Sequence, residues 1–176
     1  MSLANKKIAI LVENLYQVLE VWYPLLRLKE DGITVELIGT GSKDTYDSKE
    51  GYPAKADASI EDVDPSDFDG VIIPGGFAPD FLRRYPAVIE FVKKMDKDRK
   101  VVASICHGGW LLVSADIVKG RRATCFFAIK DDLIAAGADY VDVEVAVDKN
   151  LITSRKPEDL PAFVVEIIKQ LSSNSG

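Results

Sequence analysis

The chain alternates between short aliphatic runs and longer segments in which apolar positions follow helical spacing. In the first hundred residues the aliphatic runs have the length and composition of strands buried on both faces. These strand-like runs are residues 6–12, 34–40 and 68–73. Helical spacing predicts helices over residues 17–30 and 86–97. A stretch broken by Gly51 and Pro53, residues 46–56, predicts a hairpin or an irregular excursion.

The second part of the chain continues the alternation. Residues 101–105 form another buried strand, and a strand pair is expected within 141–153. Helices are expected over residues 108–114, 131–136 and 157–171. Strands that alternate with helices favour an α/β three-layer sandwich with a mostly parallel central sheet. In such sheets ligands bind beyond the carboxyl ends of the strands, so functional residues are expected just after strands.

Length and composition limit the classes of protein to which the chain can belong. The chain has 176 residues, 47% of them hydrophobic, which predicts one domain over residues 1–176 with flexible ends at 1–5 and 172–176. The net charge is −6 and both signs are interspersed, so we expect no concentrated positive face and no nucleic-acid partner. The apolar run before Glu13 is far shorter than the roughly 20 residues that span a bilayer, so no membrane association is expected.

The two cysteines, Cys106 and Cys125, form neither a disulfide framework nor a metal-ligand spacing. We therefore expect a cytoplasmic protein with no metal and no cofactor.

Cys106 is the strongest candidate for chemistry. It follows the strand at 101–105 and precedes His107, Gly108 and Gly109, so the chain must turn sharply there into a helix. A thiol at a helix N-terminus lies near the positive end of the backbone dipole, which predicts a lowered thiol pKa and a nucleophile. The competing interpretation is an inert, buried cysteine at a strand end.

His107 is the only histidine of the chain and directly follows this thiol. We interpret it as a base or orienting partner, against the alternative of a partly exposed histidine at a helix start. Cys125 lies between Thr124 and Phe126 without a comparable turn, and it is expected in the core.

Several motifs in this order resemble the ThiJ/PfpI superfamily, in particular its intracellular cysteine peptidase branch. They are Pro74-Gly75-Gly76, Ala103-Ser104-Ile105-Cys106-His107-Gly108, Lys119-Gly120-Arg121-Arg122-Ala123-Thr124, Asp131-Asp132 and the segment from Thr153 to Pro161. The resemblance covers nearly the whole chain. It implies a flavodoxin-like fold, self-association as a dimer or hexamer, and a cysteine paired with an acid from the first helix.

In that family the acid lies four residues before a proline, a position that matches Glu20 ahead of Pro24. A carboxyl whose pKa is raised by burial would donate a hydrogen bond to sulfur. The alternatives are a surface glutamate facing Arg27, and Glu13 as a rival acid. The Pro-Gly-Gly turn also offers backbone N–H groups near the thiol, so those of Gly76 and His107 are expected to form an oxyanion hole; the alternative is that Gly76 is a plain turn glycine.

The chain departs from the family pattern at three places. Asp80 stands where relatives have a glutamate that orients the histidine of an adjacent subunit; its alternative role is an acid at a helix start. Gly109 replaces a usual proline, and the loop 15–17 lacks the acids common there. Asp131 and Asp132 are interpreted as helix-capping residues.

The residues and the resemblance together favour a cysteine-nucleophile hydrolase that acts on a peptide or small-molecule substrate. Attack on a peptide or amide bond, on a glycated adduct or on a reactive aldehyde would use one thiol mechanism. The alternative is a redox-responsive stress protein or chaperone whose Cys106 is a sensor. A glutamine amidotransferase is disfavoured because no histidine follows His107, and a dinucleotide-binding enzyme because Glu13 follows the first strand without a glycine-rich turn.

Overall fold

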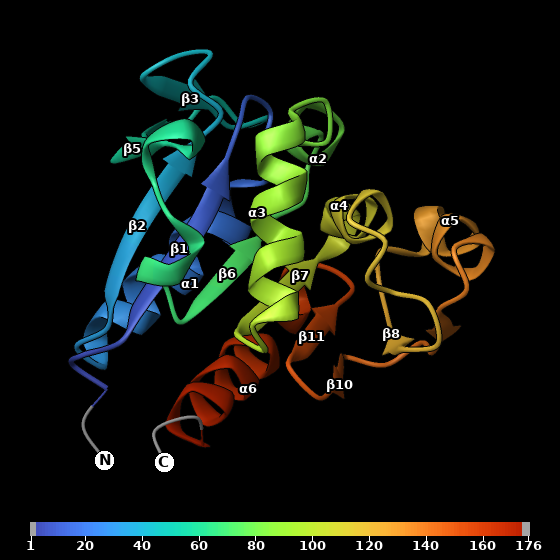
Figure 1. Cartoon of the computed structure of the whole chain (residues 1–176). Helices are drawn as coiled ribbons and strands as arrows, with labels where there is room; N and C mark the ends of the chain where they lie inside the picture. Colours follow the sequence, from blue (N-terminus) through green and yellow to red (C-terminus); the bar gives the residue numbers. More distant parts are fainter. Residues whose placement is uncertain (1–2, 174–176) are drawn as a thin grey trace.

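The computed structural model describes residues 3–173, which form a seven-stranded central sheet flanked by helices (Figure 1). The sheet consists of β1 (Lys7–Val12), β2 (Thr34–Gly39), β5 (Ala58–Ser59), β6 (Gly70–Ile73), β7 (Val101–Ile105), β10 (Val145–Asp148) and β11 (Leu151–Ser154). Their spatial order is β10-β11-β7-β6-β1-β2-β5, and only the β10–β11 pair is antiparallel. The predicted mostly parallel α/β sheet is confirmed.

Helices cover both faces of this sheet. They are α1 (Val18–Glu30), α2 (Ala78–Leu82), α3 (Pro86–Lys97), α4 (Gly109–Ser114), α5 (Lys130–Ala135) and α6 (Leu160–Ser173). In Figure 1, α3 lies in front of the sheet and α1 behind it, and α1 packs against α6. No helix within residues 3–173 is long and apolar enough to cross a membrane.

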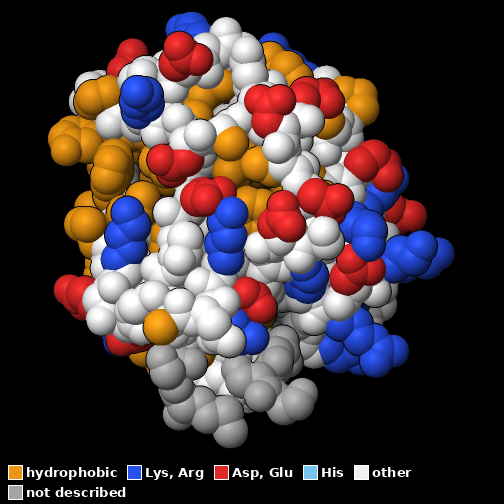
Figure 2. Space-filling view, turned by 60° about the vertical axis from the view of Figure 1, so that its left-hand side comes forward, with side chains coloured by type: hydrophobic (Ala, Val, Ile, Leu, Met, Phe, Trp, Pro, Cys, Tyr) orange, Lys and Arg blue, Asp and Glu red, His pale blue; other side chains and the backbone are white. Residues whose placement is uncertain are grey.

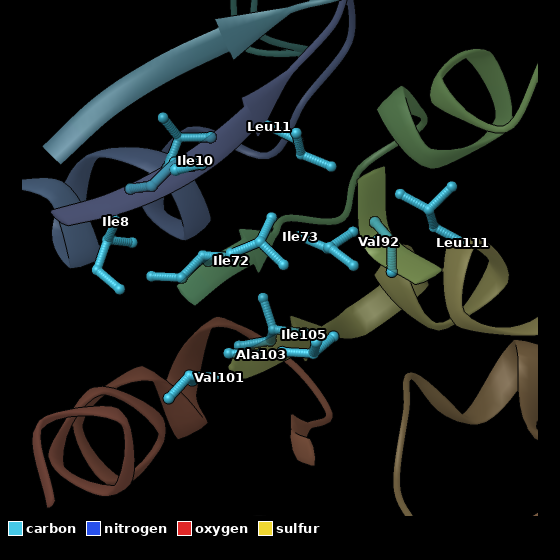
Figure 3. Packing of buried hydrophobic residues seen from close by; sticks show 14 of the residues in the cluster. Ile8, Ile10, Leu11, Ile72, Ile73, Val92, Val101, Ala103, Ile105 and Leu111 are labelled. Carbon is cyan, nitrogen blue, oxygen red and sulfur yellow. The ribbon is translucent and has the colours of Figure 1, made fainter. Parts of the chain in front are cut away.

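The core forms because the middle strands present aliphatic side chains to both helical layers. Figure 3 shows Ile8 and Ile10 of β1, Ile72 of β6 and Ala103 of β7 packed together. All four are fully buried. Burial of each large aliphatic side chain is worth about 1.5–3 kcal/mol, which explains why these runs become interior strands.

Some elements were not predicted from the sequence because they are too short to show a hydrophobic period. They are α2, β5 and the parallel pair β8 (Arg122–Ala123) with β9 (Asp139–Tyr140). The predicted hairpin is present as β3 (Thr45–Asp47) and β4 (Pro53–Lys55). Short 3₁₀ turns complete the chain: η1 (Ile60–Asp62), η2 (Pro65–Asp67), η3 (Cys106–Gly108), η4 (Phe127–Ile129) and η5 (Pro157–Asp159).

The structure describes part of each end of the chain. Leu3 is buried against the core, and α6 continues through Ser173. The remaining expected flexible residues, 1–2 and 174–176, lie outside the described part of the chain.

Candidate active site

Cys106 occupies the turn between β7 and α4, at the carboxyl edge of the sheet. Its backbone is left-handed, with φ of 59°. For a residue other than glycine this conformation costs roughly 1–2 kcal/mol. The turn is tight because Gly108 passes close to β6: a Cβ there would lie 2.6 Å from the Ile73 carbonyl oxygen. The strained sharp turn expected at Cys106 is therefore present, and strain of this kind is typical of functional sites.

Glu20 reaches the same place from the first turn of α1. The Gln17 side chain caps this helix by accepting a hydrogen bond from the Glu20 N–H, at 3.1 Å. The Glu20 side chain is fully buried, and its Oε2 accepts a hydrogen bond of 2.6 Å from the Gly75 N–H. Arg27, the partner in the surface interpretation, pairs with Asp31 at 2.8 Å instead. The structure thus places Glu20 in the interior.

The Pro-Gly-Gly turn after β6 fits between the acid and the thiol. A Cβ on Gly75 would lie 2.7 Å from both the Cys106 Cβ and the Glu20 Oε2, and 3.0 Å from the sulfur. Gly76 has φ of 75°, and a Cβ there would lie 2.6 Å from the Gln17 backbone nitrogen. Both glycines are needed for the acid, the turn and the thiol to pack together.

The electrostatics of the pair differ from the prediction of a low thiol pKa. Burial raises the pKa of Cys106 to about 12, and the Glu20 carboxylate raises it as well. Hydrogen bonds from the backbone N–H groups of His107 and Gly76 act in the opposite direction and lower it. The predicted net lowering is wrong because burial and the carboxylate outweigh these two backbone donors.

The pKa of the Glu20 carboxyl is raised as well, which favours its protonated form. Burial raises the pKa of its carboxyl to about 7, against the Gly75 and Cys106 hydrogen bonds, which lower it. Two groups that interact this strongly titrate as a pair. Over the range between these values Glu20 and Cys106 hold one proton together, and the thiolate form exists when Glu20 carries it.

His107 lies beside the sulfur, with its Nδ1 3.3 Å from the Cys106 Sγ. Its ring stacks on Phe126 at a centroid distance of 4.9 Å and meets the edge of Trp110 at 5.3 Å. Burial lowers the pKa of His107, and the charge of Lys49 lowers it further. A neutral imidazole in this position is able to accept a proton.

The other two acids proposed from the sequence lie apart from the thiol within this chain. Asp80 is in the first turn of α2, where its carboxylate forms an ion pair with Arg84 in the turn after this helix. Glu13 is buried and accepts hydrogen bonds from Thr40 and Ser42, the latter at 3.0 Å. Neither contacts Cys106 or His107 in the described residues.

Two contributors were missed from the sequence. Lys49 is carried to the site by the β3–β4 hairpin, where its N–H donates to the Tyr16 carbonyl at 2.9 Å. Phe126 was placed only as a neighbour of Cys125, yet it stacks on His107. No local motif marks either residue, since each reaches the site through a distant segment.

The sequence predicts a helix-capping role for two acids of α5. The capping interpretation is wrong: Asp131 and Asp132 lie inside the first turn of α5, whose N-cap is Ile129 with no side-chain cap, and Asp132 instead accepts a hydrogen bond from the Trp110 indole at 2.8 Å. Within residues 3–173, no group of three or more His, Cys, Asp or Glu side chains is arranged to hold a metal ion.

The chain is similar to known proteins over most of its length. A family model described as "DJ-1/PfpI family" matches residues 6–170. Deglycase PfpI of Pyrococcus furiosus is 41% identical over 94% of this chain and 99% of its own. A Bacillus subtilis protein named provisionally as the cysteine protease YraA is 42% identical over 95% of this chain and 99% of its own.

A solved structure from Anabaena variabilis, a two-domain protein with DJ-1/ThiJ/PfpI-like and ferritin-like domains, superposes with a TM-score of 0.93 at 41% identity. The match covers 95% of this chain and 48% of that one, so this chain corresponds to about half of the two-domain protein.

Proposed function

The chain belongs to the DJ-1/PfpI family and is a cysteine hydrolase of the PfpI type, and we propose that Cys106 is its nucleophile. Glu20, Gly76 and His107 are proposed as its partners. The observation that carries this assignment is the contact of Cys106 with a buried, protonatable carboxyl and two backbone N–H donors. Cys125 has no such surroundings.

The proposed reaction begins when the sulfur attacks a carbonyl carbon. The thiol proton passes to Glu20 or to the His107 imidazole, and a bond forms between sulfur and carbon. The N–H groups of Gly76 and His107 stabilise negative charge, first on sulfur and then on the carbonyl oxygen. The group that took the proton returns it to the leaving group as the bond between the leaving group and carbon breaks, and water then hydrolyses the thioester, which releases the acid and restores the thiol.

An aldehyde substrate would follow the first step only, to a hemithioacetal. The same thiol therefore suits peptide or amide bonds, glycated adducts and free reactive aldehydes. The deglycase and cysteine protease names of the relatives support this range of electrophiles.

Acid-quenched intact mass spectrometry tests the assignment. The purified protein is mixed with an activated acyl substrate and quenched within one turnover. An acyl adduct on Cys106, retained in Cys125→Ala and absent in Cys106→Ala, supports the proposal. Equal turnover in Cys106→Ala would rule it out.

We also propose self-association. Hydrophobic side chains gather along one side of the molecule in Figure 2. On α1, the exposed residues Leu19, Tyr23 and Leu26 follow helical spacing, and Tyr52 is also exposed. Contiguous exposed apolar surface of this kind is typical of interfaces. A second copy covering α1 is the proposed occupant, and a change of Leu19 and Leu26 to Lys should give monomers by sedimentation.

The role of Asp80 depends on this association. We propose that Asp80 approaches His107 of a neighbouring copy, because among residues 3–173 of its own chain it pairs only with the exposed Arg84. Asp80→Asn should then lower activity in the oligomer; activity equal to that of the unchanged protein would leave Asp80 as a helix-start acid.

A sensor role for Cys106 is the second candidate. Glu20 Oε1 is buried and has no hydrogen-bond partner in the described part of the chain, so it has capacity to accept a hydrogen bond from an oxidised sulfur. Selective oxidation of Cys106 by mild peroxide, in a protein without turnover, would favour this role. Both cysteines are free, which agrees with the proposed cytoplasmic location.

A further inference from the structure

A second cleft, of about 560 Å³, lies at the edge of the sheet opposite Cys106, where β7 and β11 begin. It is formed where the end of α3 approaches β11 and α6, a region visible in the lower part of Figure 1. We call it the basic cleft, and its lining includes Asp96, Lys97, Arg99, Arg121, Lys149 and Asn150. The sequence indicated no concentrated positive face because these residues come from separate segments.

The basic cleft is strongly cationic. Four cations and one acid line it, so it carries three net positive charges in a chain whose net charge is −6. Within the described residues, the side chains of Lys97, Arg99 and Lys149 have neither an ion pair nor a hydrogen bond. These three charges are available to a ligand.

Arg121 supplies a fixed charge in the same cleft. Its guanidinium bonds to Asp96 Oδ1 at 2.7 Å, to the Asp148 carbonyl at 2.6 Å and to Asn150 Oδ1 at 3.0 Å. The Asp148 carboxylate lies 3.9 Å from Nε, and Nε has no hydrogen-bond acceptor among residues 3–173. The two carboxylates offset the charge of Arg121, so the charge available to a ligand comes from Lys97, Arg99 and Lys149.

Two of the cations stand where the backbone favours glycine. Arg99 closes the last turn of α3 with φ of 57°, and Lys149 lies in the β10–β11 turn with φ of 56°. Both left-handed positions instead carry long basic side chains, and both side chains line the basic cleft. Backbone strain retained at two positions of one cleft favours a functional reason for these charges.

We propose that the basic cleft binds a small polyanion of the phosphate class, such as a pyrophosphate or a phosphate ester. Its volume lies within the roughly 300–1,000 Å³ of small-molecule sites. A nucleic acid is disfavoured, because the positive charges form a single cleft in an otherwise acidic protein rather than an extended stripe.

Pyrophosphate and inorganic phosphate are the probes, with chloride at equal ionic strength as the reference. Binding is followed by calorimetry and by thermal unfolding of the full chain. At ten times its dissociation constant, pyrophosphate should raise Tm by about 3–6 °C. The test variant is Arg99→Gly with Lys149→Gly, and the control is Lys43→Ala with Lys55→Ala, which removes equal charge at the β3–β4 hairpin.

The glycine variant separates ligand binding from a structural role. If these cations serve a ligand, the variant keeps or gains stability without probe, since glycine relieves the left-handed strain, and loses the pyrophosphate response. The control should keep the response. No saturable binding above chloride, an unchanged response in the glycine variant, or tighter binding of a short oligonucleotide than of pyrophosphate would overturn the proposal.

Discussion

The two cysteines show how little burial alone says about reactivity. Cys106 and Cys125 are both buried, and burial raises the pKa of each thiol to about 12. Their surroundings differ. Cys106 has the Glu20 carboxyl, two backbone N–H donors and a strained left-handed backbone, whereas Cys125 packs near Gly109 and senses only the charge of Asp132.

The difference supports our proposal that Cys106 is the reactive thiol, because its proton has a nearby acceptor. Glu20 shares a proton with Cys106, and the Gly76 and His107 N–H groups then stabilise the sulfur anion. Cys125 has no proton acceptor of this kind among the interactions that shift its pKa. A raised thiol pKa at an active site is therefore compatible with function when a neighbouring carboxyl takes up the proton.

Removing the sulfur gives the largest expected effect. Cys106→Ala should lower kcat/KM for an acyl or aldehyde substrate by about 1,000-fold or more, because no other group forms the covalent bond. Steady-state rates of the two purified single variants, Cys106→Ala and Cys125→Ala, measure this directly. Comparable losses in both would erase the distinction between the two thiols.

Glu20→Gln removes the shared proton without removing the hydrogen bond from Gly75. Activity should fall by roughly 100-fold, as for loss of a general acid or base. Stability should change with pH, because the Glu20 pKa is raised from 4.5 to about 7 in the folded protein. The free energy of unfolding is highest below pH 4.5, where Glu20 is protonated in both the folded and the unfolded state. It falls by about 3 kcal/mol as the pH rises to about 7.

The glutamine variant should therefore equal the unchanged protein in stability near pH 4.5 and exceed it near pH 8. Urea unfolding at the two pH values measures this. A variant that is less stable at both would indicate that the carboxylate itself is needed by the fold.

Gly75→Ala brings a methyl group between acid and thiol. Its Cβ would lie 2.7 Å from the Cys106 Cβ, so stability should fall by about 1–3 kcal/mol and activity should fall with it. Gly109→Ala is the matched control beside Cys125. Its nearest contact is the end of the Leu133 side chain at 3.1 Å, which can move, so the change should stay within about 1 kcal/mol. Equal losses by chemical denaturation would contradict this account.

The smallest effect is expected for Cys125→Ala. It should cost about 1 kcal/mol through lost packing and leave activity within about threefold, because Cys125 is buried and lies outside the reacting set. Thermal unfolding and steady-state rates together provide the measurement. A loss of activity larger than the loss of folded protein would bring Cys125 into the mechanism.

The sequence predicted the elements that are long and regular. β7 and α3 have the expected bounds because a buried strand and an amphipathic helix each repeat one pattern over several residues. Short elements such as α2 and β8 carry too few residues for a pattern.

Within the site, Cys106 was visible because its turn is local in sequence. Glu20 came from the family resemblance, and the oxyanion donors were expected from the Pro-Gly-Gly turn. The thiol pKa was predicted in the wrong direction, since its value depends on how close a carboxylate from α1 lies to the end of β7. Lys49 and Phe126 were missed because only the folded chain brings the hairpin and the segment before η4 to His107.

The pH dependence of Cys106 alkylation, measured in Cys125→Ala, tests the shared proton most directly. The account predicts a rate that rises to about pH 7, stays level while the pair holds one proton, and rises again only near pH 12. In Glu20→Gln the level region should disappear. A single inflection near the ordinary thiol pKa of about 8.5, unchanged in Glu20→Gln, would contradict the account.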